Sequence, residues 1–197
     1  TMERLVAVAK KLRLEENFNG YIHLKSIPGA SDELMREAGL YADRLSVNIE
    51  IPTKSGLKLL APDKNFEDFI KPMEKVKNEI IQYKSEKKII RSTPKYAPAG
   101  QSTQMIVGAS GENDFQILKT AEHYYKNFNL KRVYYSGYVP ISYDNRLPNI
   151  GSEVPMLREN RLYQSDWLTR FYGFQTNEIV NIHHQNLDLD IDPKLSW

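Results

Sequence analysis

Polar side chains that can bind a ligand recur at every second position in short segments of this chain. In segment 21–25, Tyr21, His23 and Lys25 alternate with aliphatic residues, and in segment 45–51 serine, asparagine and glutamate do so. Alternate residues of a β-strand point to the same face of its sheet. Each segment therefore offers one face of hydrogen-bond donors and acceptors, which suits the binding of a polar small molecule.

Two later segments extend this pattern. Segment 132–139 places Arg132, Tyr134 and Ser136 at alternate positions, whereas segment 101–107 has polar residues at both parities. Those residues are Gln101 and Thr103 on one parity, and Ser102 and Gln104 on the other. Burying polar groups without partners is costly, so the shared polar face must be hydrated or hold a polar ligand.

A glycine-bearing turn follows the apolar run 105–107. Gly108 and Gly111 bracket this turn, and Glu112 and Asp114 place acidic residues in the first turn of the next helix. Ligands gather at such turns in βα folds. The turn lacks the lysine of a phosphate-binding Walker loop. Alternatively, the turn binds no ligand, and its glycines are needed only for the backbone geometry.

The remaining pattern alternates helices with these strands. Helical spacing predicts helices over 1–16, 32–40, 65–88, 112–128 and 155–172, with strands near 21–25, 45–51, 103–107 and 132–139. Such alternation predicts an α/β fold with a parallel sheet, here a partial TIM-like barrel whose polar strand face points into the lumen. The alternative is an antiparallel sheet with one face in solvent.

Finer features of these elements are also predicted. Leu5, Val8 and Leu12 form the expected buried stripe of the first helix, Ser31 caps the second, and Thr176 caps a short late helix. Residues 1–153 form the expected partial-barrel part, and 154–197 form C-terminal helices and an extended acidic tail that pack on it.

Composition limits the class of protein. The chain has 197 residues, no cysteine and a net charge of +2, and it contains no apolar run long enough for a membrane span. We therefore expect a cytoplasmic globular chain without disulfides or thiolate metal sites. We also expect that it does not interact with a membrane. The opening Thr1-Met2 suggests a piece of a longer protein, by design or by proteolysis.

Four groups of residues indicate less chemistry than their types first suggest. Asp188, Asp190 and Asp192 lack the glycine and glutamate of a calcium loop, and the adjacent His183 and His184 point apart. We therefore predict no metal site. A basic stretch and an aromatic series are interpreted as a solvated helix end and as core, rather than as nucleic-acid contacts. These are Lys84, Lys87, Lys88, Arg91 and Lys95, and Tyr163, Trp167 and Phe171.

Five runs of residues resemble one family. They are NGYIHLKSIPGA at 19–30, ADRLSVNIEIP at 42–52, PKYAPAGQSTQMIVGA at 94–109, RVYYSGYVP at 132–140 and RLYQSDWLTRFYGF at 161–174. The chain is similar to radical S-adenosylmethionine (SAM) proteins, most of all to those of the DNA modification/repair family. The resemblance implies a (β/α)6 barrel in which a CxxxCxxC loop holds a [4Fe-4S] cluster that cleaves SAM reductively to a radical.

The resemblance also implies roles for individual residues. The cofactor-binding residues it implies for SAM are Ser46, Asn48, Glu50, Val107, Gly108, Ala109, Tyr135 and Ser136. The residues implied to face the substrate or the SAM carboxylate are His23, Lys25, Gln101, Gln104 and Tyr134. Because the chain has no cysteine, the cluster would belong to the parent protein, and this fragment alone is expected to be inactive. Its catalytic residues are not assigned.

Two further functions remain open. The chain is a nucleic-acid-binding module without catalysis, or a non-radical TIM-like enzyme that binds another polar small molecule. The expected partners are DNA or a nucleotide substrate. An incomplete barrel also exposes the edge of its first strand, so self-association through that edge is expected.

Overall fold

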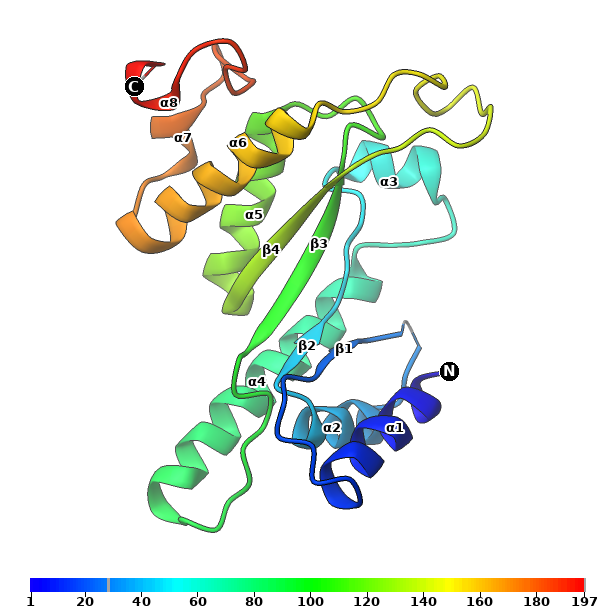
Figure 1. The fold of residues 1–197 in the computed structure, drawn as a ribbon, viewed down its shortest axis with the longest axis vertical. Coiled ribbons are helices and arrows are strands. Elements are labelled where there is room, and N and C mark those ends of the chain that lie inside the picture. The colour runs from blue at the N-terminus through cyan, green and yellow to red at the C-terminus, as the bar shows by residue number, and fades with distance from the viewer. Residues whose placement is uncertain (28, 197) are drawn as a thin grey trace. The chain divides into compact units, whose positions relative to one another are not determined.

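The chain folds around one parallel sheet, seen in a computed structural model that describes residues 1–27 and 29–196, the side chains of 193 and 196 excepted. The strands are β1 (His23–Lys25), β2 (Arg44–Ser46), β3 (Gln101–Val107) and β4 (Leu130–Gly137), in the sheet order β1-β2-β3-β4 (Figure 1). β1 pairs with β2, and β2 with β3, in parallel. The predicted α/β class with a parallel sheet flanked by helices is therefore confirmed.

Helices separate these strands, close to where the sequence predicted them. The structure contains α1 (Met2–Leu14), α2 (Asp32–Tyr41), α3 (Lys54–Leu60), α4 (Glu67–Ile89), α5 (Asp114–Phe128), α6 (Met156–Trp167), the π-helical turn η1 (Leu168–Tyr172), α7 (Thr176–Ile179) and α8 (Pro193–Ser196). Ser31 caps α2 as predicted, since its side chain accepts a hydrogen bond from the Leu34 N–H at 3.3 Å. α3 lies in a segment for which the sequence predicted no helix, and α8 lies in the segment predicted as an extended tail. α3 forms because the Thr53 hydroxyl accepts the Gly56 N–H at 3.1 Å.

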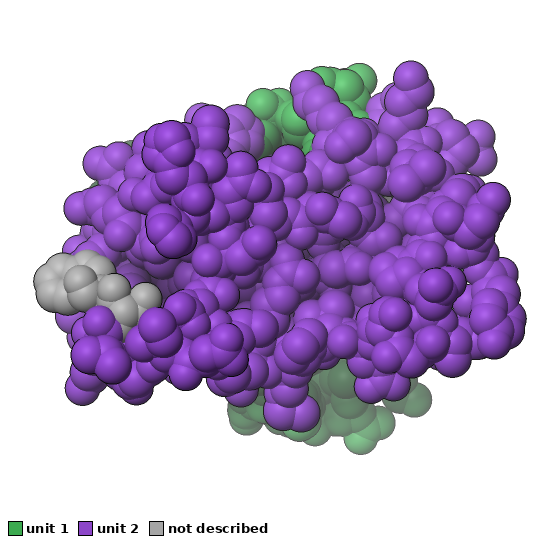
Figure 2. Space-filling view, turned by 90° about the horizontal axis from the view of Figure 1, so that it is seen from above, with its two compact units in different colours: residues 1–48, 66–103, 128–132 green, residues 49–65, 104–127, 133–197 purple. Residues whose placement is uncertain are grey.

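The chain divides into two compact units (Figure 2). Unit 1 comprises Thr1–Asn48, Phe66–Thr103 and Phe128–Arg132, and unit 2 comprises Ile49–Asn65, Gln104–Asn127 and Val133–Trp197. The sequence placed a boundary near residue 153 instead. Residues 133–153 and the C-terminal helices belong to the same unit because long-range contacts, rather than chain order, define a compact body.

In unit 1, α1, α2 and α4 contribute to one apolar core beneath β1 and β2. The core contains Met2, Val6 and Ala9 of α1, with Ile22, Leu24, Met35, Ala38, Leu45 and Val76 from the other elements. The prediction that Leu5, Val8 and Leu12 are buried was wrong for two of them, because Leu5 is 38% and Val8 59% exposed. α1 carries two apolar stripes, and the one with the smaller residues packs on this core.

Arg13 ties the end of α1 to the start of β1. Its guanidinium donates to the Phe18 and Gly20 carbonyls and, at 2.6 Å, to the Asp43 carboxylate, which also accepts the Ile22 N–H at 2.8 Å. These partly buried, charge-assisted bonds hold the connection between helix and strand.

We expect Arg13→Met to lower the free energy of unfolding by about 2 kcal/mol, because several hydrogen bonds to a charged group are lost together. Urea denaturation followed by circular dichroism measures the change. The exposed Arg4 of the same helix is the control. Arg4→Met should change stability by less than about 0.5 kcal/mol. Equal losses in the two variants would contradict the role given to Arg13.

In unit 2, α5 and α6 pack on the apolar residues of β3 and β4. Met105 and Val107 of β3 and Val133 of β4 are fully buried, as are Ile117 of α5 and Leu162 of α6. The strand predicted over 45–51 does not continue through this region, and only an isolated parallel bridge joins Glu50 to Met105. Glu50 has a φ of 60°, a left-handed conformation that interrupts an extended strand.

Glu122 of α5 is a buried acid held by three donors. Its carboxylate accepts hydrogen bonds from Lys126, from Lys119 at 3.3 Å and from the Thr176 hydroxyl at 2.7 Å. Thr176 therefore does not cap α7 as predicted, and Gln175 holds the N-cap position instead. Burial alone would raise the pKa of Glu122, but the three donors outweigh it and hold the pKa at about 2.

This depressed pKa predicts how stability depends on pH. The unfolded chain binds a proton at Glu122 near pH 4.5 and the folded chain only near pH 2. Glu122 therefore contributes fully above pH 4.5, and its contribution is lost as the pH falls through that window. In urea titrations, Glu122→Gln should reduce this acid-side loss, while Glu15→Gln at an exposed site should leave it unchanged. An unchanged pH profile in Glu122→Gln would contradict the prediction.

Candidate functional site

The strands of unit 1 present a row of polar side chains on the face opposite the helices. In the parallel register His23 pairs with Arg44, and Lys25 pairs with Ser46, which in turn pairs with Ser102. Residues paired across parallel strands share a face. These five residues alternate with Leu24 and Leu45, which belong to the core beneath α1, α2 and α4. We call them the polar strand face.

The polar strand face combines positive charge with hydroxyl groups. The Ser102 hydroxyl lies 3.4 Å from Nε2 of His23, and the Arg44 guanidinium donates to the Ala99 carbonyl at 3.0 Å. Burial and then the charge of Arg44 lower the pKa of His23, so its imidazole is neutral at pH 7. Ser46 and Ser102 are buried, and Lys25 is exposed. Such a face can donate to a carboxylate, a phosphate or a ribose hydroxyl.

Gln101 lies on the other face of the sheet, although the sequence predicted it to face substrate. It pairs with Leu45, and its side-chain amide donates to the Met73 carbonyl of α4 at 3.1 Å and to the Phe128 carbonyl of α5. Gln101 is fully buried. Its role is to satisfy backbone carbonyls beneath the sheet, and Ser102 occupies the polar strand face in its place.

The predicted cofactor residues are divided between the units. Ser46 and Asn48 belong to unit 1, and the other six belong to unit 2. In unit 2, Glu50 lies 3.6 Å from the Lys64 ammonium group, and its backbone bonds to the Gln104 carbonyl and the Ile106 N–H. Val107, Ala109 and Tyr135 are buried, whereas Tyr134 and Ser136 are half-buried. The tyrosine ring of Tyr135 packs edge-on against Tyr163 of α6.

The glycine turn after β3 is filled by its own acid. The Glu112 carboxylate accepts hydrogen bonds from the N–H groups of Gly108 and Ser110, the latter at 3.0 Å, and from the Ser110 hydroxyl at 2.6 Å. These are the donors that an anionic ligand would use at such a turn. Glu112 is buried, and the sequence identified only its place in the first helical turn. This observation favours the structural interpretation of the turn.

Two glycines in unit 2 allow close approach by the start of α6. A Cβ on Gly108 would lie 2.5 Å from the Val154 side chain, and one on Gly137 would lie 2.6 Å from the Glu159 carboxylate. Gly108 also has a φ of 83°. A glycine is therefore required at position 108, both by the backbone conformation and by the packing within unit 2.

The aromatic series of α6 and η1 is only partly core, contrary to the sequence interpretation. Tyr163 bonds to the backbone of Tyr135, but Trp167 is 53% and Phe171 59% exposed. The Trp167 and Phe171 rings lie 4.3 Å apart, and the Arg170 guanidinium lies 4.7 Å from the centroid of Phe171. The two exposed rings form a surface on which a flat ligand can stack.

Residues of the basic stretch and of the acidic series form hydrogen bonds with neighbouring backbone groups. The Lys87 ammonium group of the basic stretch donates to the Thr93 carbonyl at 2.6 Å, beyond the end of α4. The Asp188 carboxylate accepts the N–H groups of Asp190 and Ile191. Within the described residues, no group of three histidine, cysteine, aspartate or glutamate side chains is placed to hold a metal ion. In that same part of the chain, no helix is both long and apolar enough to cross a membrane.

Comparisons with known proteins add no relative to this description. A scan against protein-family models, a search of curated proteins and a search of solved structures each found no match.

Proposed function

We propose that this chain supplies part of the SAM and substrate pocket of a radical SAM protein of the DNA modification/repair type. The observation that carries the proposal is the polar strand face of unit 1. Parallel strands covered by helices on one face and lined with polar groups on the other are what the inner wall of a partial (β/α) barrel requires. The resemblance at 19–30, 42–52 and 94–109 covers all five residues of this face.

The polar strand face suits the carboxylate end of SAM. Lys25 and Arg44 carry the positive charge that a carboxylate prefers, and His23 pairs with Arg44 on the neighbouring strand. Asn48 is next along the strand path and is half-buried, so it can bond a ribose hydroxyl. When bound beside an iron–sulfur cluster, SAM supplies the radical chemistry of this family.

The cluster itself does not fit this chain. No cysteine is present to hold it, so no reaction step is assigned to these residues. In unit 2, the groups that could bind a ligand already have partners, because Glu112 occupies the donors of the glycine turn and Lys64 neighbours Glu50. The proposal therefore depends on unit 1.

A ligand titration of the whole chain tests the proposal. S-adenosylhomocysteine, a stable analogue with the same carboxylate, is added while the His23 imidazole is followed by NMR. We expect weak binding, with a dissociation constant of about 1 mM, or −4 kcal/mol. The carboxylate should raise the pKa of His23, which is depressed in the free chain.

A pair of lysine variants makes the test specific. Lys25→Gln removes a charge from the polar strand face, and Lys84→Gln removes one from the exposed surface of α4. We expect about 3–10-fold weaker binding in the first variant, or about 1 kcal/mol, and unchanged binding in the second. An NMR signal of the His23 imidazole that stays unchanged up to about 10 mM ligand would reject the proposal. That concentration corresponds to a binding free energy of about −3 kcal/mol.

The exposed aromatic pair favours a second candidate, a nucleic-acid-binding module. Trp167 and Phe171 offer a stacking surface, and stacking contributes about 1–3 kcal/mol per base. In a Trp197→Phe variant, Trp167 is the single tryptophan and reports binding of an oligodeoxythymidylate by fluorescence quenching. Quenching that weakens with salt and is lost in Phe171→Ala, but not in Tyr143→Ala, supports this candidate. Absence of quenching removes it.

A further inference from the structure

α1 presents a second apolar face, of which the unit 1 core covers only Leu12 in part. Met2, Val6 and Ala9 are buried in the unit 1 core, while Leu5 and Val8 remain exposed and Leu12 is half-buried. A surface helix normally has one apolar stripe, directed at the core beneath it. A contiguous second stripe marks a surface where another body packs.

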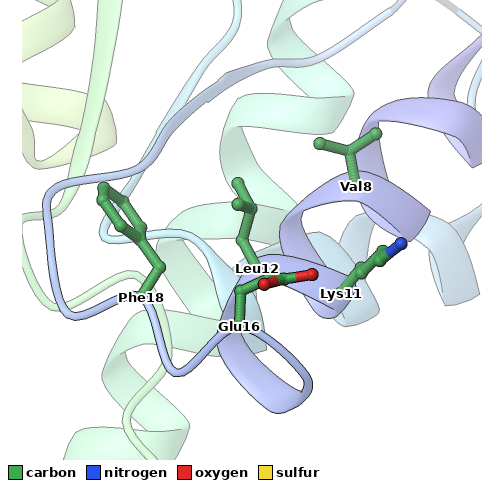
Figure 3. A pocket seen from close by; sticks show the side chains of 5 residues that line it. All are labelled: Val8, Lys11, Leu12, Glu16 and Phe18. Carbon is green, nitrogen blue, oxygen red and sulfur yellow. The ribbon is translucent and has the colours of Figure 1, made fainter.

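The second face borders a shallow pocket that is open to solvent. The pocket has a volume of about 430 Å³ and is lined by Val8, Lys11, Leu12, Glu16 and Phe18 (Figure 3). We call it the α1 pocket. It combines three apolar side chains with one positive and one negative charge.

The walls of the α1 pocket are held in place. The Phe18 N–H donates to the Leu12 carbonyl at 2.8 Å, and Arg13 donates to the Phe18 carbonyl. The Phe18 ring covers Gly20, where an added Cβ would lie 2.2 Å from the ring. Phe18 is nevertheless 42% exposed. The apolar surface is therefore presented by a fixed turn and not by a loose chain end.

We propose that the α1 pocket is the docking surface for a second copy of this chain, related by a two-fold axis. A two-fold contact places the same patch against itself, so a patch that holds both charges can complement itself. Lys11 of one copy then meets Glu16 of the other, and the apolar side chains meet between these pairs. Within the described residues, neither Lys11 nor Glu16 takes part in an ion pair.

The chemistry of the pocket favours this occupant over a small molecule. Small-molecule sites enclose their ligand and orient it with a few buried polar groups. Here the two charged side chains, Lys11 and Glu16, are exposed, and Val8 is 59% and Phe18 42% exposed. A contact this small covers less than the ~800 Å² per partner of a standard interface, so the dimer should be weak.

Sedimentation velocity of the whole chain from about 10 µM to 1 mM tests the proposal. We expect reversible dimers with a dissociation constant of roughly 100 µM, or about −5.5 kcal/mol. Val8→Asp should abolish the dimer. Val139→Asp is the matched control, since Val139 is 58% and Val8 59% exposed, and it should dimerise like the unaltered chain.

Variants that exchange the charges of Lys11 and Glu16 distinguish this contact from other modes of self-association. Lys11→Glu and Glu16→Lys should each weaken the dimer about 3–10-fold, because each places like charges opposite one another. The double variant should restore it, since the two signs are then only exchanged. A monomer at every concentration, a dimer that survives Val8→Asp, or a double variant no better than the single ones would overturn the proposal. Circular dichroism verifies that each variant keeps its helices.

Discussion

Replacing Asp166 with alanine should lower the free energy of unfolding by about 3–5 kcal/mol, since breaking a buried ion pair leaves its partner without compensation. The Asp166 side chain is completely buried in α6. Its carboxylate accepts the Arg170 guanidinium at 2.7 Å and the Tyr125 hydroxyl of α5. Tyr125 in turn accepts the Val133 N–H at 2.8 Å, so the network joins α5, α6 and β4 within unit 2.

Urea denaturation of Asp166→Ala followed by tyrosine fluorescence measures this loss. Asp144→Asn is the control, because Asp144 pairs at 2.7 Å with Arg146 on the surface and should contribute little. A second measurement follows the ionisation of the Tyr125 hydroxyl. Burial and then the charge of Asp166 raise the pKa of Tyr125, so Asp166→Ala should move tyrosine ionisation to lower pH. Equal stabilities of the two variants would show that the buried Asp166 carboxylate and its bond to Tyr125 do not hold α5 to α6.

Gly39→Ala should destabilise unit 1, although alanine is the better helix former. Gly39 lies in α2, where the exchange would gain about 1 kcal/mol from helix propensity. A Cβ at this position would lie 2.2 Å from the Tyr96 ring. Tyr96 is buried, stacks on Tyr83 at 5.1 Å and donates its hydroxyl to the Met35 carbonyl at 3.2 Å. The stack and the hydrogen bond hold the ring in this position.

Overpacking of this kind costs roughly 1–3 kcal/mol, and the propensity gain offsets about 1 kcal/mol of it, so we expect a net loss of about 1 kcal/mol in Gly39→Ala. A double-mutant cycle with Tyr96→Leu identifies the cause, because the smaller side chain removes the clash. The effect of Gly39→Ala should then approach its propensity gain. Ser85→Ala on the exposed surface of α4 reports the gain from propensity alone. A stabilised Gly39→Ala variant would contradict the packing between α2 and Tyr96.

The chain order of helices and parallel strands could be predicted because local signals agree with it. The apolar period of 65–88 predicted α4, and the Ser31 cap predicted the start of α2. The alternation in 21–25 and 45–51 separated His23, Lys25 and Ser46 from the core residues. In these segments each residue's face follows from its position in the strand, and no distant residue is needed to decide it.

Some features could be read only from the tertiary structure, because a distant partner decides them. α1 has two stripes of similar hydrophobicity, and only packing against α2 selects Val6 and Ala9 over Val8. Gln101 is buried because backbone carbonyls of α4 and α5 need its amide. Arg44 joined the polar strand face through its pairing with His23, although its parity with Ser46 could have identified it.

The sequence by itself predicted the α/β class, the parallel sheet and the places of His23, Lys25 and Ser46 on the polar strand face, since a period of two or 3.6 residues is a local property. Tertiary structure alone decided which acids are internal. Asp166 accepts the Tyr125 hydroxyl of α5 and Glu122 accepts the Thr176 hydroxyl, yet both resemble surface acids in the sequence. Each of these carboxylates is buried where a donor distant in the sequence meets it, and such a meeting exists only in the folded chain.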